Sequence, residues 1–372
     1  MPQRVLITGG AGFIGSHVVD ELLRHDYEVR ALDNLSSQVH GSSAVRPAYL
    51  DADVELLIGD VRDGDTLGRA LRGVEAVVHL AAAVGVGQSM YQVDRYTAVN
   101  NLGTAVLLQQ IIDRPVSRLV VASSMSIYGE GLYRSSDGRL HNAAERSLEQ
   151  LRACDWELHG SDGEVLSPVP TPETKPPSLT SVYALSKFDQ ERLCLLIGRA
   201  YDIPTVALRF FNVFGTRQAL SNPYTGVLAI FASRLLNGNA PLIFEDGLQQ
   251  RDFVSVRDVA VACRLALETP AAAGGVFNIG SGRARSILEI AELMATALRV
   301  PHIEPHVTGK YRFGDIRHCV ADISLASRVL GYQPRIGIEE GLIELSDWLE
   351  GQIPQDKVAE ATTELASRGL TI

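Results

Sequence analysis

The sequence predicts an α/β protein built on a doubly wound parallel sheet, with a second, smaller α/β lobe that binds substrate. Two observations lead to this fold. Short apolar runs alternate with segments of helical periodicity through the first half of the chain, and the runs are apolar on both faces, as parallel strands are when helices cover both sides of their sheet. After residue 210 the elements become shorter, which indicates the separate lobe.

The first lobe is expected to contain six strands and three main helices. The strands are expected at residues 5–8, 28–33, 54–59, 76–81, 118–123 and 205–210. The helices are expected at residues 13–24, 101–113 and 182–201. In the first helix Ile14, Val18, Leu22 and Leu23 recur at helical spacing, which is typical of a helix that packs one face on a sheet.

Residues 130–180 interrupt this alternation with charges, glycines and a proline-rich stretch, so we expect a surface insertion of loops with one short helix at 142–154. The smaller lobe is expected to hold helices at 227–236, 256–267, 287–298 and 338–349, and strands at 242–244, 252–254 and 276–279. The predicted domains are therefore residues 1–210, rejoined by 250–275, and a lobe of residues 211–249 and 276–372.

Composition excludes several classes of protein. The formal net charge of −10 gives a surface that repels phosphate backbones, so we do not expect nucleic-acid binding. No apolar run reaches the roughly 18 residues that a membrane span needs. The four cysteines form no C-x-x-C pair and we expect no metal site. The N-terminus runs straight into a strand without the pattern of a signal peptide, so a reducing, cytoplasmic location is expected.

A glycine-rich loop with the spacing G-x-x-G-x-x-G follows the first strand and opens the first helix. Gly9 permits a tight turn, Gly12 lets the backbone approach a pyrophosphate, and Gly15 lets helix and strand pack closely. The helix start, at Phe13 and Ile14, offers free N–H groups to phosphates. Because strand and helix are both in place, the loop predicts a Rossmann-type dinucleotide-binding domain and not a plain turn.

An acidic residue, Asp33, ends the second strand. A carboxylate there accepts hydrogen bonds from ribose hydroxyls and repels a 2′-phosphate, so NAD is the predicted cofactor and not NADP. Asn34 is assigned to the same site. Asp60 and Val61 follow the third strand at the place expected for the adenine ring, although Asp60 is equally well placed to cap the next helix.

Tyr183 and Lys187 lie four residues apart at the start of a helix and so share one face. To act as a base near neutral pH, Tyr183 must lower its pKa by roughly 3 units, which an ammonium and a bound, positively charged nicotinamide can supply. Ser124, at the carboxyl end of the fifth strand, faces the crevice where ligands bind and can share a proton with Tyr183. The alternatives are an exposed Tyr–Lys pair and a serine that only caps its strand.

Together these motifs resemble the extended short-chain dehydrogenase/reductases, and among them the nucleotide-sugar epimerases and dehydratases. The resemblance covers nearly the whole chain. It is carried by residues 8–15, Leu80, Ala81, Ala82, Asn100, Gly103, Thr104, Ser124, Tyr183, Lys187 and residues 209–213, 251–254, 257–259, 277–280 and 312–315.

The resemblance implies roles for these residues. Ser124, Tyr183 and Lys187 become the catalytic triad. The cofactor site gains Leu80, Ala81, Ala82 and Asn100, and the substrate site consists of Val84, Ser124, Asn212, Val227, Ile243, Phe244, Arg251 and Arg312. The two arginines would clamp the pyrophosphate, which supplies the local positive charge that an acidic protein needs for an anionic substrate. Ile243 and Phe244 would lie against the nucleobase, unless they are plain core strand.

Family members usually pair through the helix that carries Tyr–Lys and the long helix before it, so a homodimer is expected. The outer faces of these helices would carry Leu107, Leu108, Ile111, Leu193 and Leu196. The alternative is that these residues only cover the sheet.

The implied reaction begins when the Tyr183 phenolate takes the proton of a sugar 4-hydroxyl while hydride leaves C4 for NAD⁺, which gives a 4-ketosugar. Hydride return to the other face gives a 4-epimer, water loss a dehydratase product, and release a dehydrogenase product. Dehydratases of this family carry Asp-Glu directly after the catalytic Ser/Thr, whereas this chain has Met125 and Ser126, which cannot act as acid and base at neutral pH.

The sequence therefore favours an NAD-dependent 4-epimerase of a UDP- or dTDP-sugar that works through a transient 4-keto intermediate. Residues 85–89 and the insertion resemble those of bacterial epimerases that act on nucleotide-linked deoxysugars. The alternative is a reductase, dehydrogenase or dehydratase of the same fold. A non-catalytic, dinucleotide-sensing relative is disfavoured because Ser124, Tyr183 and Lys187 are all present.

Overall fold

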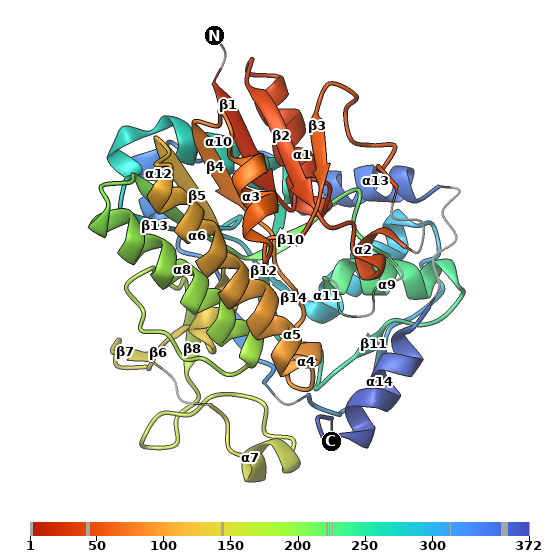
Figure 1. Cartoon of the computed structure of the whole chain (residues 1–372). Coiled ribbons are helices and arrows are strands. Elements are labelled where there is room, and N and C mark those ends of the chain that lie inside the picture. Colours follow the sequence, from red (N-terminus) through yellow and green to blue (C-terminus); the bar gives the residue numbers. More distant parts are fainter. Residues whose placement is uncertain are drawn as a thin grey trace.

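The computed structural model describes residues 3–41, 45–142, 145–220, 222, 224, 226–312, 314–350 and 356–371. Its centre is a seven-stranded parallel sheet with helices on both faces (Figure 1). The strands, in the order in which they lie, are β13 (Val276–Ile279), β9 (Thr205–Phe210), β5 (Arg118–Ser124), β4 (Ala76–His79), β1 (Arg4–Thr8), β2 (Glu28–Asp33) and β3 (Glu55–Ile58). The strand order changes direction between β1 and β4, where doubly wound sheets bind ligands. The predicted fold class is confirmed.

Each strand of this sheet buries side chains on both faces. In β1, Val5 and Ile7 pack on one side and Leu6 on the other. The first side is covered by α1 (Phe13–Leu23), α10 (Val256–Glu268) and α12 (Ser324–Leu330). The second is covered by α3 (Gly64–Ala70), α6 (Gly103–Asp113) and α8 (Val182–Ala200). This double covering explains why the strands read as continuous apolar runs.

The long helix expected at 101–113 is divided in the structure. Its α-helical part is α6, and a π-helical turn, Thr97–Leu102, precedes it after the short helix α5 (Val93–Tyr96). Four of the residues expected on an outer, dimer-forming face do not lie there. Leu107, Leu108 and Ile111 are buried against the sheet, and Leu193 packs at the edge of the same cluster. The alternative reading, that these residues cover the sheet, is the correct one for them.

The smaller lobe is built on a four-stranded sheet and three helices. The sheet contains β10 (Asn212–Phe214), β12 (Gln250–Ser255), β14 (Ala284–Ser286) and β16 (His318–Cys319), and a separate pair is formed by β11 (Leu242–Ile243) and β15 (His306–Val307). A second apolar core forms beneath α9 (Val227–Leu236), α11 (Ile287–Ala297) and α13 (Ile338–Leu349). The C-terminal helix α14 (Val358–Ser367) lies beside this lobe (Figure 1).

The expected boundary between the lobes differs from the structure at β12, which lies in the four-stranded sheet of the smaller lobe, and at β13 and α12. Residues 276–279 were assigned to the smaller lobe, but β13 pairs in parallel with β9 and forms the edge of the main sheet. The helix α12 then packs in the main core through Ala326 and Leu330. The reason is that a short apolar strand fits either sheet, so its pattern alone does not choose a partner.

The insertion is more ordered than a set of surface loops. Strands β6 (Leu132–Arg134), β7 (Leu140–Asn142) and β8 (Ser167–Val169) form a small antiparallel sheet, and α7 (Leu148–Arg152) is shorter than the expected helix, of which residues 143 and 144 lie outside the described part. Buried ion pairs fasten the insertion to the smaller lobe. The Arg146 guanidinium lies 2.9 Å from Glu245, and Arg317 lies 2.5 Å from Glu157 of the insertion.

One buried ion pair fixes α8 on the main sheet. The Arg209 guanidinium on β9 donates to both carboxylate oxygens of Glu191 on α8, at 2.9 and 2.7 Å. The Ser123 hydroxyl on β5 donates to the same carboxylate at 2.6 Å. Arg209 and Ser123 are register partners on neighbouring strands, so one side chain of the helix is bonded to two strands.

Replacing Glu191 tests this account. Glu191→Ala should lower the free energy of unfolding by roughly 3–5 kcal/mol, because it leaves a buried guanidinium without its carboxylate. Urea denaturation followed by circular dichroism measures the change. The matched control is Glu28→Ala, which removes an exposed pair with Arg4 and should cost less than about 1 kcal/mol. Equal, small losses in both variants would contradict the account.

Candidate active site

A cleft of about 780 Å³ runs along the carboxyl edge of the main sheet. Residues of β10, β12 and α9 line it from the smaller lobe. It brings together most of the residues that the sequence singled out for binding and catalysis. These are Gly9, Gly12, Phe13, Ile14, Gly15, Asp33, Asn34, Asp60, Val61, Leu80, Ala81, Ala82, Val84, Ser124, Tyr183, Lys187, Asn212 and Val227.

The glycine loop has the shape of a phosphate cradle. Gly9 adopts a φ of +74°, which L side chains rarely take. A Cβ on Gly15 would lie 2.0 Å from the Gly9 carbonyl oxygen, so close packing of helix on loop requires glycine there. A Cβ on Gly12 would have Gly9 O at 3.3 Å as its one neighbour within 4 Å and would otherwise occupy open space. These residues fit a bound dinucleotide.

Asp33 is held at the edge of the same loop. Its carboxylate accepts hydrogen bonds from the Ala11 N–H at 3.1 Å and the Leu35 N–H at 2.9 Å. An ionised carboxylate has about four lone-pair positions, so about two of them remain for other donors. The carboxylate is thus fixed in place at the end of β2, beside the cleft.

The part of the cleft beside Asn34 contains an ion pair, Asp60–Arg62, whose arginine was not predicted from the sequence. Arg62 donates to both oxygens of Asp60 at 2.8 Å, and Asn34 donates to Asp60 at 3.2 Å. The hydrogen bonds from Arg62 lower the pKa of Asp60 to about 2. The available signal for Arg62 was its place in the turn after the third strand, which ends at Ile58, because such turns meet at the ligand-binding edge of the sheet.

Ser124 lies at the end of β5 with its oxygen already occupied as an acceptor. It accepts hydrogen bonds from the backbone N–H of Ser126 at 3.2 Å and from the Ser126 hydroxyl at 2.9 Å. A serine oxygen has two lone pairs and one hydrogen, so the Ser124 hydroxyl is left to donate. The Tyr183 side chain lines the same cleft.

Tyr183 begins α8, whose N-terminus is well capped. The Ser181 hydroxyl accepts the Ala184 N–H at 3.1 Å, and the Tyr183 N–H donates to Ser89 at 3.0 Å. Burial raises the pKa of Tyr183, while its hydrogen bond with Ser124 opposes the rise. The expected fall in pKa is therefore absent from the protein by itself, and at neutral pH the side chain is a phenol.

Lys187 lies one helical turn further and is 4% exposed. Burial lowers the pKa of Lys187 to about 8. Its ammonium donates to Gln190 Oε1 at 2.7 Å. Burial thus disfavours the charged forms of both Tyr183 and Lys187, and a positively charged cofactor with its ribose is the group whose binding would make the phenolate favourable.

Asn100 does not line the cleft, in contrast to its predicted contact with the cofactor. Its side chain is fully buried, accepts the Ala83 N–H at 2.7 Å, and donates to the Ala83 carbonyl at 3.1 Å and to Ser186 at 2.9 Å. It therefore shapes the loop that follows β4 and joins that loop to α8. The sequence does not show whether the Asn100 side chain bonds to loop backbone or to a ligand.

Four predicted substrate residues also lie outside the cleft. Ile243 is fully buried in the core of the smaller lobe, so the alternative reading as core strand is correct for it. Arg251 donates to the backbone carbonyls of Gln250 and Arg317, both at 2.9 Å, and of Ile316 at 2.5 Å. A guanidinium has five donors, and here main-chain oxygens satisfy three bonds that were expected for a phosphate.

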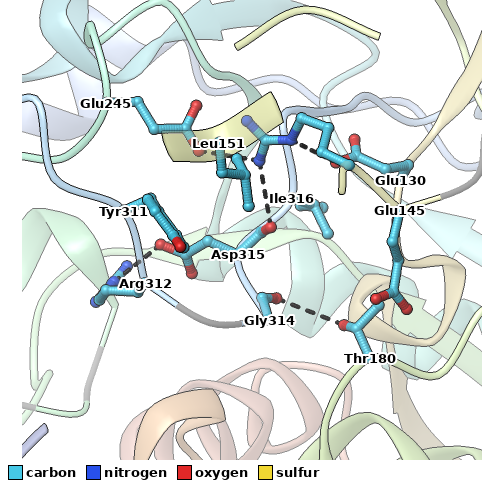
Figure 2. Close-up of a pocket in the computed structure, with 11 residues that line it drawn as sticks. Glu130, Glu145, Leu151, Thr180, Glu245, Tyr311, Arg312, Gly314, Asp315 and Ile316 are labelled. Carbon is cyan, nitrogen blue, oxygen red and sulfur yellow. Dashed lines mark hydrogen bonds and ion pairs between the residues drawn. The ribbon is translucent and has the colours of Figure 1, made fainter. Parts of the chain in front are cut away.

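Arg312 lines a different, small pocket of about 50 Å³, and Phe244 lies beside it in contact with Arg312. Arg312 pairs with Asp315 at 2.8 Å, and its guanidinium stacks 4.6 Å from the centre of the Phe244 ring. Figure 2 shows Arg312, Asp315 and Glu245 around this pocket. Phe313 of the same motif lies outside the described residues. Arg251 and Arg312 thus lie outside the cleft in this structure, and the pyrophosphate clamp stays a prediction.

Fold and cleft together define a dinucleotide-binding α/β protein with a Ser–Tyr–Lys set at the carboxyl edge of its sheet. Residues 5–148 and 157–280 match the model of the NAD dependent epimerase/dehydratase family. The chain belongs to this family, as the motifs had indicated.

Relatives match over nearly their whole length. The chain is 36% identical to dTDP-L-rhamnose 4-epimerase of Burkholderia thailandensis, over 94% of this chain and 96% of that protein. UDP-glucose 4-epimerase of Thermus thermophilus, solved with NAD, is 32% identical with a TM-score of 0.73, over 94% and 99% of the two chains. UDP-N-acetylglucosamine 4-epimerase of Methanobrevibacter ruminantium is 30% identical with a TM-score of 0.77, over 94% and 99%.

Two glycine variants should separate cofactor binding from folding. Gly12→Ala should fold, since its backbone at φ −76° suits alanine, but its methyl group would obstruct the pyrophosphate and lower NAD content at least roughly tenfold. Gly15→Ala should instead destabilise the protein, because its Cβ collides with backbone. Thermal melts and chromatography of extracted nucleotides measure both. Full NAD content in Gly12→Ala would refute this reading of the loop.

Proposed function

We propose that this chain is an NAD-dependent nucleotide-sugar 4-epimerase that acts on a UDP- or dTDP-sugar through a transient 4-keto intermediate. The observation that carries the proposal is that Ser124, Tyr183 and Lys187 line one cleft together with a dinucleotide loop. Relatives named as 4-epimerases of UDP- and dTDP-sugars support this substrate class.

The cofactor would be held by the glycine loop and Asp33, and when bound it supplies a hydride acceptor and a positive charge. Tyr183 as phenolate takes the proton from the sugar 4-hydroxyl, so that C4 becomes a carbonyl carbon as it loses hydride. Ser124 donates to the reacting oxygen. After the ketosugar presents its other face, hydride returns to C4 and Tyr183 gives the proton back to the 4-oxygen, which leaves the atom balance unchanged.

Carboxylates are distributed in a way that favours epimerisation over dehydration. Among the described residues that line the cleft, the carboxylates are Asp33 and Asp60, both at the dinucleotide end. Beside Ser124, where a dehydratase needs an acid and a base, Met125 is buried and Ser126 is bonded to Ser124. A 4-epimerase needs no further proton donor, so its requirements are met by Ser124, Tyr183 and Lys187.

The proposal is tested by incubating the protein with UDP-glucose, dTDP-L-rhamnose and related UDP-, dTDP- and GDP-sugars. NMR should show the anomeric signals of a C4 epimer in at least one mixture. Tyr183→Phe should lower turnover by roughly 10²–10⁴-fold because it removes the base, with NAD content unchanged. A Phe variant that keeps turnover, or products that have lost water, would contradict the proposal.

We also propose a homodimer that pairs through α8 and the helical segment before it. Of the residues expected on this surface, Leu196 is exposed, at 44%, and it is joined by two leucines that were not expected, Leu102 and Leu185, both at 53%. Exposed leucines grouped on neighbouring helices are typical of an interface. A cytoplasmic location stays a prediction. Among the described helices, none combines the length and hydropathy that a bilayer crossing requires.

Sedimentation tests the dimer. The wild-type chain of 40.3 kDa should sediment at twice that mass at micromolar concentration. Leu185→Lys combined with Leu196→Lys should sediment as a monomer with an unchanged circular dichroism spectrum, because charges are costly at the centre of an interface. A wild-type monomer, or a dimer that the two lysines do not affect, would refute the proposed interface.

A further inference from the structure

A chain of buried polar side chains connects Lys187 to the start of the dinucleotide loop. Lys187 donates to Gln190 Oε1 at 2.7 Å, and Gln190 Nε2 donates to Thr104 Oγ1 at 2.7 Å. Thr104 Oγ1 lies 2.9 Å from His79 Nε2, and His79 Nδ1 lies 2.7 Å from Thr8 Oγ1. The chain crosses from α8 through α6 and β4 to β1, and all five residues are 4% exposed or less.

The donor and acceptor roles of these five side chains follow from the hydrogen bond that the Thr104 hydroxyl donates. The Thr104 hydroxyl donates to the Asn100 carbonyl at 2.6 Å, so its oxygen can only accept from Gln190 and His79. His79 must then carry its proton on Nε2 and accept from the Thr8 hydroxyl at Nδ1. Thr8 Oγ1 in turn accepts the Ala81 N–H at 3.3 Å. With these roles each hydroxyl and each ring nitrogen has a partner.

This assignment fixes which end of the Gln190 amide faces Lys187. Because Thr104 needs a donor, the NH₂ group of Gln190 points to Thr104 and its carbonyl oxygen points to the ammonium. If the amide were reversed, its NH₂ group would face an ammonium, donor against donor, in a site that excludes water. The orientation of one amide therefore depends on residues of three other elements.

We propose that Gln190 is a positioning residue, whose amide, oriented by Thr104, His79 and Thr8, holds the Lys187 ammonium in place one helical turn from Tyr183. An ammonium has three hydrogens. Gln190 takes one of them on the side away from the cleft, so two remain for groups in the cleft. The inference rests on the proposed function only in giving Lys187 a part in the reaction.

The surroundings of Lys187 support this role. The titratable groups that interact with it are Glu191 and Cys194 on α8 and His79 on β4. Glu191 is already paired with Arg209. Burial raises the pKa of the Cys194 thiol to about 12, and burial lowers the pKa of His79 to about 3, so both are neutral near pH 7. The Gln190 side-chain oxygen is thus the group that accepts a hydrogen bond from the Lys187 ammonium.

The number of lysines makes a direct test possible. The chain has four, Lys175, Lys187, Lys310 and Lys357, so protein labelled with ¹³C-lysine gives few side-chain signals. The Lys187 signal is the one that Lys187→Arg removes. Its titration midpoint is then measured by NMR in the purified full-length protein, for the wild type and for Gln190→Leu and Gln190→Glu.

The two Gln190 variants should shift the midpoint in opposite directions. Gln190→Leu removes an acceptor from the charged form and should lower the midpoint by roughly one unit, whereas Gln190→Glu adds a negative charge and should raise it by roughly one unit. The alkaline limb of kcat should move with the midpoint, since neutral Lys187 no longer favours a phenolate. The matched control is Gln110→Leu on the neighbouring helix α6, beside Gly68, which should leave the midpoint unchanged.

Thr104→Val gives a second test without any change on α8. It frees the Gln190 amide to rotate and should lower the Lys187 midpoint, while Thr104→Ser, which keeps the hydroxyl, should restore it. Equal midpoints in all variants, or shifts of the same sign in Gln190→Leu and Gln190→Glu, would overturn the inference. If the Lys187 midpoint shifts in opposite directions in the two Gln190 variants but the protein epimerises none of the sugars, the positioning role is supported and the proposed function is refuted.

Discussion

The carboxylate of Glu191 accepts hydrogen bonds from Arg209 on β9 and Ser123 on β5, and this contact sets the position of α8 on the main sheet. Ser123 precedes Ser124, and Glu191 follows Lys187 by one helical turn. The ion pair beneath the sheet edge thus sets the distance between the end of β5 and the start of α8. The reacting groups can meet at the cleft because a buried charge pair beside them allows few other arrangements.

The cleft above this pair buries the side chains of Tyr183 and Lys187. Burial raises the pKa of Tyr183 and lowers that of Lys187, so the charged forms of both are disfavoured. A dinucleotide with a positive nicotinamide reverses this balance for the phenolate. Proton removal is thereby coupled to the presence of a hydride acceptor, which suits an enzyme that must return the hydride it removes.

Much of the fold was predictable because its signals are local. Strands such as Ala76–His79 and Arg118–Ser124 contain uninterrupted apolar runs, and the glycine loop and Ser181 mark helix starts by their chemistry. The partner of β13 was not predictable, since a strand of four residues, three of them apolar, fits either sheet. The small sheet of the insertion was also missed, because its stability depends on distant partners such as Glu245 and Arg317.

In the candidate site, too, residues with local signals were predicted and residues that depend on distant partners were not. Ser124, Tyr183 and Lys187 were identified because strand ends and helix spacing place them, and the structure brings them into one cleft. Arg251 and Arg312 were not found there, because an arginine takes any acceptor within reach and the sequence does not show which are near. Ser126, Gln190 and Arg62 were overlooked for the complementary reason: ordinary polar residues gain their roles from neighbours that the fold supplies.

The central claim is that hydride leaves C4 and returns to it without exchanging with water. Conversion of the preferred nucleotide-sugar in D₂O, followed by NMR of the product, tests it most directly. The account predicts that the epimerised carbon keeps its original hydrogen, with no deuterium at C4, because hydride on a cofactor does not exchange with solvent. Deuterium at the inverted carbon would show that a proton had been removed from carbon, and would contradict the account.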